Sequence, residues 1–177
     1  MEKALSILSP FLEDPLREFH IRELAKILKK NHMTIRAYLN TFVKEGFLLK
    51  KKSKLYDAYQ ANTTSKRLRN LKLYYNLEML RKSKLIEDIE LVYDYPTIVL
   101  FGSYATATNV KESDIDICII TNISKEFNIE KYRSLLKRNI SIHKFAEKEF
   151  SAMKRKNPEL INSICNGIVL SGKLEVV

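Results

Sequence analysis

The sequence has few cysteines and no long uncharged apolar run. The two cysteines, Cys118 and Cys165, lack metal-ligand spacing, and their small number predicts a reducing environment rather than a disulfide framework. A run of about 18 uncharged apolar residues, which a membrane-spanning helix requires, is absent. The first 15 residues carry acids and a proline where a signal peptide would need an apolar stretch. We therefore expect a soluble, cytoplasmic protein that does not bind a membrane.

Positive charge is what the sequence has in excess. Its 31 Lys and Arg against 21 Asp and Glu give a net charge of +10. The excess is greatest in residues 44–72, where nine basic residues face two acidic ones. Such a surplus favours a polyanionic partner. A solvated surface run, or the lysine enrichment of thermophiles, would produce the same composition.

Residues 20–62 have the pattern of two helices followed by a basic turn between two strands. Asn31 can cap the second helix, which should end near Gly46. The apolar residues at helical spacing in the two segments are Ile21, Leu24, Ile27 and Leu28, then Ile35, Leu39, Phe42 and Val43. The other face of the second helix presents the polar residues His32, Thr34, Arg36 and Asn40.

This order of elements, over residues 3–62, resembles the winged helix-turn-helix family. The resemblance implies a domain at 1–64 that binds double-stranded DNA, with the second helix in the major groove. Thr34, Arg36 and Asn40 would then face the bases. The wing residues expected to contact phosphates are Lys50, Lys51, Lys52 and Lys54. The alternative is that this domain only packs or dimerises.

Residues 65–95 contain neither glycine nor proline, and their apolar residues follow helical spacing with a break at Lys82. We expect a connector helix that packs on the core. A dimer-forming helix is the alternative, since winged-helix proteins often pair to match two DNA half-sites, and it would make the protein a homodimer.

The stretch GSYATATNVKESDIDI, residues 102–117, predicts a phosphate and metal site. A buried strand at 97–101 precedes it, a short helix should start at the Gly-Ser turn, and residues 114–120 read as the next strand. Because side chains alternate along a strand, Asp114 and Asp116 share one face, where they repel each other unless a cation lies between them. Carboxylate oxygens suit Mg²⁺, and the turn offers N–H groups to a phosphate.

This arrangement resembles the minimal nucleotidyltransferases of the DNA polymerase β superfamily, over residues 96–150 and toward the C-terminus. The resemblance implies an α/β (α+β) protein in which residues 96–177 form a mixed sheet with flanking helices. Gly102 and Ser103 would bind the phosphates of an NTP, with ATP expected, while Asp114 and Asp116 would be the catalytic pair that binds Mg²⁺. The family transfers a nucleoside monophosphate to a hydroxyl and releases pyrophosphate. Some small members are antitoxins that modify a partner toxin.

The sequence departs from the family pattern at two places. Ala107 stands where a second glycine is common, and we expect the helix to accommodate it. The segment 138–145, which should carry a third carboxylate, offers only Ser141 and His143 on the relevant face. His143 could accept a proton, although a histidine on a strand is more often structural. Beside the turn, Tyr104 either stacks on a base or packs in the core.

Three functions remain open on the sequence alone. One is a nucleotidyltransferase that modifies a protein, such as a cognate toxin, or another hydroxyl acceptor. The second is a DNA-binding transcription regulator whose transferase fold has become a nucleotide sensor. The third is a structural partner in a toxin–antitoxin pair without chemistry of its own. The Gly-Ser turn and the aspartate pair favour the first function, and the missing carboxylate favours the second.

Overall fold

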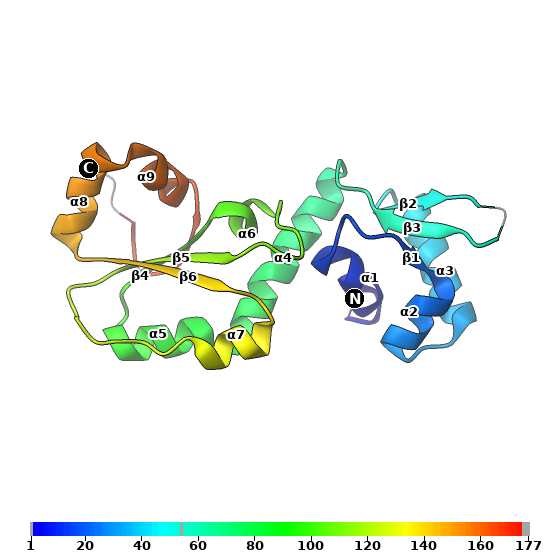
Figure 1. Cartoon of the computed structure of the whole chain (residues 1–177), viewed down its shortest axis with the longest axis horizontal. Coiled ribbons are helices and arrows are strands. Elements are labelled where there is room, and N and C mark those ends of the chain that lie inside the picture. Colours follow the sequence, from blue (N-terminus) through cyan, green and yellow to red (C-terminus); the bar gives the residue numbers. More distant parts are fainter. Residues whose placement is uncertain (1, 54, 175–177) are drawn as a thin grey trace. The chain divides into compact units, whose positions relative to one another are not determined.

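The computed structural model describes residues 2–53 and 55–174 and divides into two compact units, residues 1–72 and 73–177 (Figure 1). The division falls inside a single helix, α4 (Lys66–Ser83). Each unit has its own β-sheet. Within the described part of the chain, no helix combines the length and the apolar character needed to cross a membrane.

The first unit combines three helices with a three-stranded antiparallel sheet. The helices are α1 (Glu2–Glu13), α2 (Ile21–Leu28) and α3 (His32–Lys44). The strands, in sheet order, are β1 (Phe19–His20), β3 (Ala58–Ala61) and β2 (Leu48–Lys51). The side chain of Asn31 accepts a hydrogen bond of 2.7 Å from the N–H of Met33, which confirms the predicted start of α3. Gly46, at φ +77°, follows the helix end as predicted.

The second unit contains a four-stranded mixed sheet, as the sequence predicts. In sheet order its strands are β6 (Ile140–Phe145), β5 (Ile115–Ile120), β4 (Thr97–Phe101) and β7 (Ile168–Ser171). Strand β4 is antiparallel to both of its neighbours, whereas β5 and β6 are parallel. The protein is therefore of the mixed α+β class.

Helices cover both faces of this sheet (Figure 1). The helices are α4, α5 (Leu85–Tyr93), α6 (Gly102–Thr106), α7 (Glu130–Leu136), α8 (Glu147–Lys156) and α9 (Pro158–Cys165). One core, which contains Ile115, Ile117 and Ile119 of β5, packs against α4, α5 and α7. The other, which contains Cys118, packs against α8 and α9. The alternation predicted for β5 is therefore confirmed.

The connector predicted at 65–95 is two helices rather than one. Helix α4 ends at Ser83, whose hydroxyl donates a 2.6 Å hydrogen bond to the carbonyl of Leu80. Lys84 has φ +59°, outside helical geometry, and α5 begins at Leu85. The break predicted near Lys82 is thus present two residues later.

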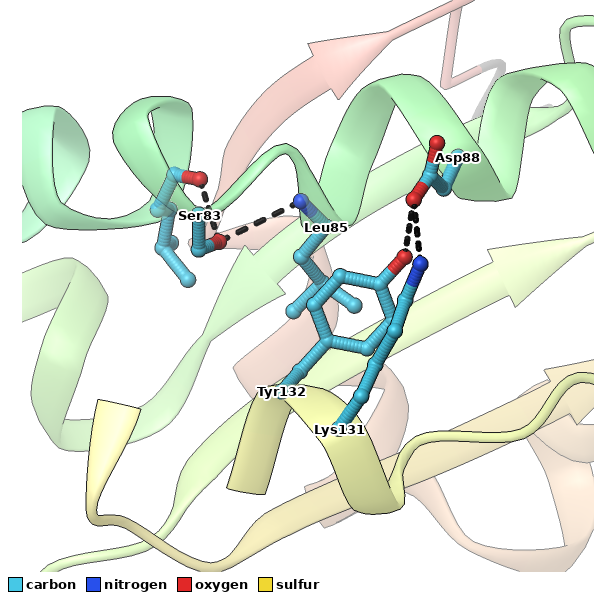
Figure 2. A network of polar contacts seen from close by, with 6 residues as sticks. Ser83, Leu85, Asp88, Lys131 and Tyr132 are labelled. Carbon is cyan, nitrogen blue, oxygen red and sulfur yellow. Dashed lines mark hydrogen bonds and ion pairs between the residues drawn. The ribbon is translucent and has the colours of Figure 1, made fainter. Parts of the chain in front are cut away.

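Figure 2 shows how α5 is tied to α7: the carboxylate of Asp88 accepts hydrogen bonds from Lys131, at 2.9 Å, and from the hydroxyl of Tyr132. Tyr132 is buried, while Lys131 is exposed. The bond from Lys131, and then that from Tyr132, lower the pKa of Asp88. Because the folded-state pKa is depressed, this contact stabilises the fold above the pKa of the unfolded chain. The stabilisation is lost as the pH falls through the folded-state pKa.

Removing the Tyr132 hydroxyl should therefore have a pH-dependent effect. We expect Tyr132→Phe to lower the free energy of unfolding by about 1 kcal/mol at pH 7, because one partly buried hydrogen bond is lost. The deficit should shrink as the pH falls below the pKa of an aspartate in the unfolded chain, about 3.9, and through the lowered folded-state pKa of Asp88. Urea unfolding at pH 7 and pH 3 measures both effects. Tyr74→Phe, at an exposed position, is the control, and an equal loss in both variants at both pH values would contradict the assignment.

Candidate functional site

The turn after β4 brings the backbone of Gly102 against the carboxylate of Asp116. Phe101, the last residue of β4, is the register partner of Asp116 on β5. Gly102 has φ +68°, and a Cβ added to it would lie 2.5 Å from Oδ2 of Asp116. Both the backbone conformation and the available space therefore require glycine at this position. Ser103 follows at the start of α6, as predicted.

The two aspartates lie where β5 begins. Asp114 is exposed and immediately precedes the strand, while Asp116 is half-buried at its second position. Neither carboxylate makes a hydrogen bond or ion pair with any residue that the structure describes. Burial raises the pKa of Asp116 and Asp114 raises it further, while His143 acts in the opposite direction. The site thus holds two neighbouring negative charges without a matching donor.

This donor set fits one hard divalent cation. Two unpaired carboxylates suit a Mg²⁺ ion that takes its other ligands from water and substrate phosphates. Within residues 2–53 and 55–174 there is no group of three or more His, Cys, Asp or Glu placed to hold a metal. A reaction that uses two metal ions would need more ligands than these.

Strand β6 places a serine where a further carboxylate would complete the site. The parallel register pairs Asp116 with Ser141 and Cys118 with His143, so both β6 residues share the face of Asp116, as predicted. The ring of His143 packs edge-on against that of Phe101, with centroids 5.3 Å apart. The hydroxyl of Ser141 is neither a carboxylate ligand nor a general base.

One expectation for the turn needs correction, and the structure decides between the two alternatives for Tyr104. Ala107 does not continue the helix: it follows α6 with φ +55°, a left-handed conformation that costs an L-residue roughly 1–2 kcal/mol. Tyr104 is only 1% exposed, and its hydroxyl accepts a 3.0 Å hydrogen bond from Nε of Arg138. Its ring belongs to the core, so it cannot stack on a base.

Sequence reasoning missed the residues that hold the loop between α6 and β5. The buried side chain of Asn76, on α4, donates to the carbonyl of Tyr104 at 3.0 Å and to Oδ1 of Asn109 at 2.9 Å. The carbonyl of Ser103 also accepts from the N–H groups of Thr108 and Asn109. An asparagine on the apolar face of a predicted helix was the available signal. These bonds fix the course of the chain from the turn toward Asp114.

In the first unit, the residues predicted to read bases lie together on α3. Thr34, Arg36 and Asn40 are exposed, opposite the buried residues Ile35, Leu39 and Phe42. Arg22 was not predicted. Its guanidinium lies 5.1 Å from the ring centroid of Tyr56, beside a cleft of about 660 Å³ between α2, α3 and the β2–β3 loop. The only signal for it was a basic residue in the first turn of α2.

The predicted wing lysines are not equivalent. Lys50 forms a 2.7 Å ion pair with Asp57, and Lys51 pairs with Glu18. Lys52 is exposed and has no ion pair with a described residue, whereas Lys54 lies outside the described residues. The charge available to a polyanion is therefore smaller than the lysine run suggests.

Residues 82–169 match the family model described as "Nucleotidyltransferase domain". The chain carries a nucleotidyltransferase domain. The match runs from the end of α4 into β7 and includes the Gly-Ser turn and both aspartates. Among curated proteins, none matches this chain.

Two solved structures are similar at low identity. HmgR from Pseudomonas aeruginosa is 16% identical with a TM-score of 0.36, covering 58% of this chain and 41% of that one. A candidate transcriptional regulator from Rhodococcus sp. RHA1 is 13% identical with a TM-score of 0.33, covering 72% and 47%. This chain thus spans less than half the length of either protein. At these TM-scores neither likeness carries an argument about fold or function.

A substitution at Gly102 tests the geometry of the nucleotidyltransferase domain. We expect Gly102→Ala to lower the free energy of unfolding by more than Gly46→Ala. Both glycines have positive φ, but a Cβ at Gly46 would meet nothing within 4 Å, whereas one at Gly102 would collide with Asp116. Gly46→Ala should cost about 1–2 kcal/mol, the left-handed penalty alone. Thermal or urea unfolding of the two variants measures the difference, and equal losses would argue against the close contact.

Proposed function

We propose that this chain is a DNA-binding protein whose nucleotidyltransferase domain binds an NTP, most simply ATP, together with Mg²⁺. The proposed nucleotide binding rests on Asp114 and Asp116. Neither carboxylate has a hydrogen-bond or ion-pair partner among the described residues, and Asp116 lies against the backbone of Gly102. In a protein of net charge +10, two adjacent carboxylates without a donor are a feature that structural packing does not require. A cation bound between them would remove their repulsion.

Each residue of the site has a role that follows from its position. Gly102, which has no side chain, leaves room for the Asp116 carboxylate against its backbone. Gly102 and Ser103 would bind the phosphates through their N–H groups and the Ser103 hydroxyl. Asp114, which is exposed, and Asp116, which is half-buried, would hold the Mg²⁺ ion. When bound, the ion neutralises phosphate charge and fixes the orientation of the triphosphate.

Of the two candidate functions, nucleotide binding is better supported than transfer of a nucleoside monophosphate. Transfer to a hydroxyl acceptor requires a group that removes the acceptor's proton. Asp114 and Asp116 would hold the cation, and Ser141 cannot take that proton. His143, the other group on this face, packs its ring against that of Phe101. We therefore favour a transcription regulator that senses a nucleotide. The second candidate, transfer of a nucleoside monophosphate to a protein such as a cognate toxin, is supported by the family match over residues 82–169.

DNA binding is proposed for the first unit. The order α2, α3, β2, β3 is that of a winged helix-turn-helix, and the exposed face of α3 carries Thr34, Arg36 and Asn40. Arg and Asn can each make paired hydrogen bonds to base edges in the major groove. In the wing, Lys52 is the best candidate for a phosphate contact, because Lys50 and Lys51 already have carboxylate partners. A homodimer would match two half-sites.

Nucleotide binding is tested at Asp116. We expect wild type to bind ATP saturably in Mg²⁺ and Asp116→Asn, which removes only the charge, to bind at least about tenfold more weakly. Glu159→Gln, an exposed carboxylate on α9, is the control. The same proteins incubated with α-³²P-labelled ATP, CTP, GTP or UTP report on transfer. Label on the protein or an added acceptor that depends on Asp116 would establish the second candidate. ATP binding unaffected by Asp116→Asn would reject the proposed nucleotide site.

DNA binding is tested with two substitutions of different kinds. Arg36→Ala should weaken binding to the DNA sequence that wild type selects from a random library by about 1–3 kcal/mol. The variant should also discriminate less between bases at the contacted position. Lys52→Ala should weaken binding to all DNA sequences alike. It should also reduce the salt dependence of the binding constant by about one released counterion. Fluorescence anisotropy at several salt concentrations measures both. Lys3→Ala on α1 is the control. Equal DNA affinity and equal salt dependence in all three variants would contradict the proposed interface.

A further inference from the structure

A second cavity lies at the end of the sheet opposite to the aspartate pair. It has a volume of about 800 Å³ and lies between the start of β4, the end of β5 and helix α8. Thr97 and Ile120, which line it, are register partners at one end of the β4–β5 pair, whereas Phe101 and Asp116 are partners at the other. Figure 1 likewise shows α8 and α6 at opposite ends of the sheet.

The charge lining this cavity favours an anion. Three cationic side chains, of Lys154, Arg155 and Lys173, face two carboxylates, of Asp94 and Glu147. The side chains of Arg155 and Lys173 are exposed and make no hydrogen bond or ion pair in the described part of the chain. A guanidinium is a good partner for a phosphate because it can donate two parallel hydrogen bonds.

Apolar and aromatic groups lie beside these charges. Phe150, which is 4% exposed, Pro96 and Ile120 contribute carbon atoms to the lining. Tyr95 also lines the cavity and is 67% exposed, so its ring is accessible to a ligand. A ligand with both a planar ring and a negative charge would use both parts of this lining.

The backbone beside the cavity is strained. Asp94 and Tyr95 are consecutive and have φ values of +52° and +55°, although neither is glycine. The N–H of Tyr95 donates to the carbonyl of Glu90 at 2.9 Å, which holds the turn in place. Asp94 is the left-handed C-cap of α5, and Tyr95 continues the turn out of that cap. Here the turn places Tyr95 in the cavity lining.

We propose that this cavity binds a small aromatic anion of nucleotide size, made of a planar ring and a phosphate group. The phosphate would contact Arg155 and Lys173, and the ring would lie against Tyr95. The volume is within the range of small-molecule sites. This site goes beyond the proposed function: it needs no metal ion and does not involve Asp114 or Asp116.

The test uses the full chain, EDTA to remove metal, and two probes. AMP carries a ring and a phosphate, while inorganic tripolyphosphate carries phosphate alone. Calorimetry with wild type and with the Asp114→Ala/Asp116→Ala double variant should give the same affinity for AMP, because the aspartate pair does not take part. Arg155→Glu and Lys173→Glu should each weaken the binding of both probes at least tenfold. Lys148→Glu, at an exposed position of α8 outside the cavity lining, should not.

Tyr95→Asn separates the ring from the phosphate. Asparagine adopts the left-handed conformation readily, so the variant should remain folded. The variant should bind AMP more weakly than wild type does, and its affinity for tripolyphosphate should be unchanged. The proposal is overturned if wild type binds neither probe, if Lys148→Glu weakens binding as much as Arg155→Glu, or if Tyr95→Asn leaves AMP affinity unchanged. Loss of AMP binding in the double aspartate variant would assign the probe to the other site and would also reject the proposal.

Discussion

The close approach of Gly102 to the Asp116 carboxylate is the constraint on which the nucleotide site depends. A Cβ added to Gly102 would lie only 2.5 Å from Oδ2 of Asp116, so the turn at the start of α6 and the aspartate are in close contact. The sheet sets this contact, because Phe101 and Asp116 are partners in the β4–β5 register. The hydrogen bond from Asn76 to Asn109 then holds the loop that leads from the turn to Asp114. The backbone of the turn and the carboxylate of Asp116 are thus positioned by the same buried strands.

What the site lacks decides its chemistry as much as what it contains. The aspartate pair has no donor among the described residues, which leaves room for a cation. The residue paired with Asp116 on β6 is Ser141, which cannot complete a two-metal set or accept a proton. Under our proposal, the domain binds a nucleotide through the aspartate pair and, without a third carboxylate, responds to it instead of transferring it. Joined to a basic, exposed recognition helix, it would make a regulator.

Alternation along short strands was the most informative part of the sequence. It predicted that Asp114 and Asp116 share a face and that Ser141 lies beside them, because strand periodicity is local and buried isoleucines define the other face. Features set by tertiary contacts were not predictable. The buried role of Asn76 and the pairing of Lys51 with Glu18 depend on residues distant in sequence. The left-handed conformations of Ala107 and Tyr95 belong to local turns that no glycine marks in the sequence.

The most direct test of the central claim is to locate a divalent cation on the folded protein. We would add Mn²⁺ with ATP to ¹⁵N-labelled protein and follow paramagnetic broadening of backbone amides. The amides around Gly102, Ser103 and Asp116 should broaden at low Mn²⁺, and Asp114→Asn/Asp116→Asn should abolish the effect. Broadening confined to other carboxylates, or unchanged in the double variant, would contradict a metal–nucleotide site at this turn.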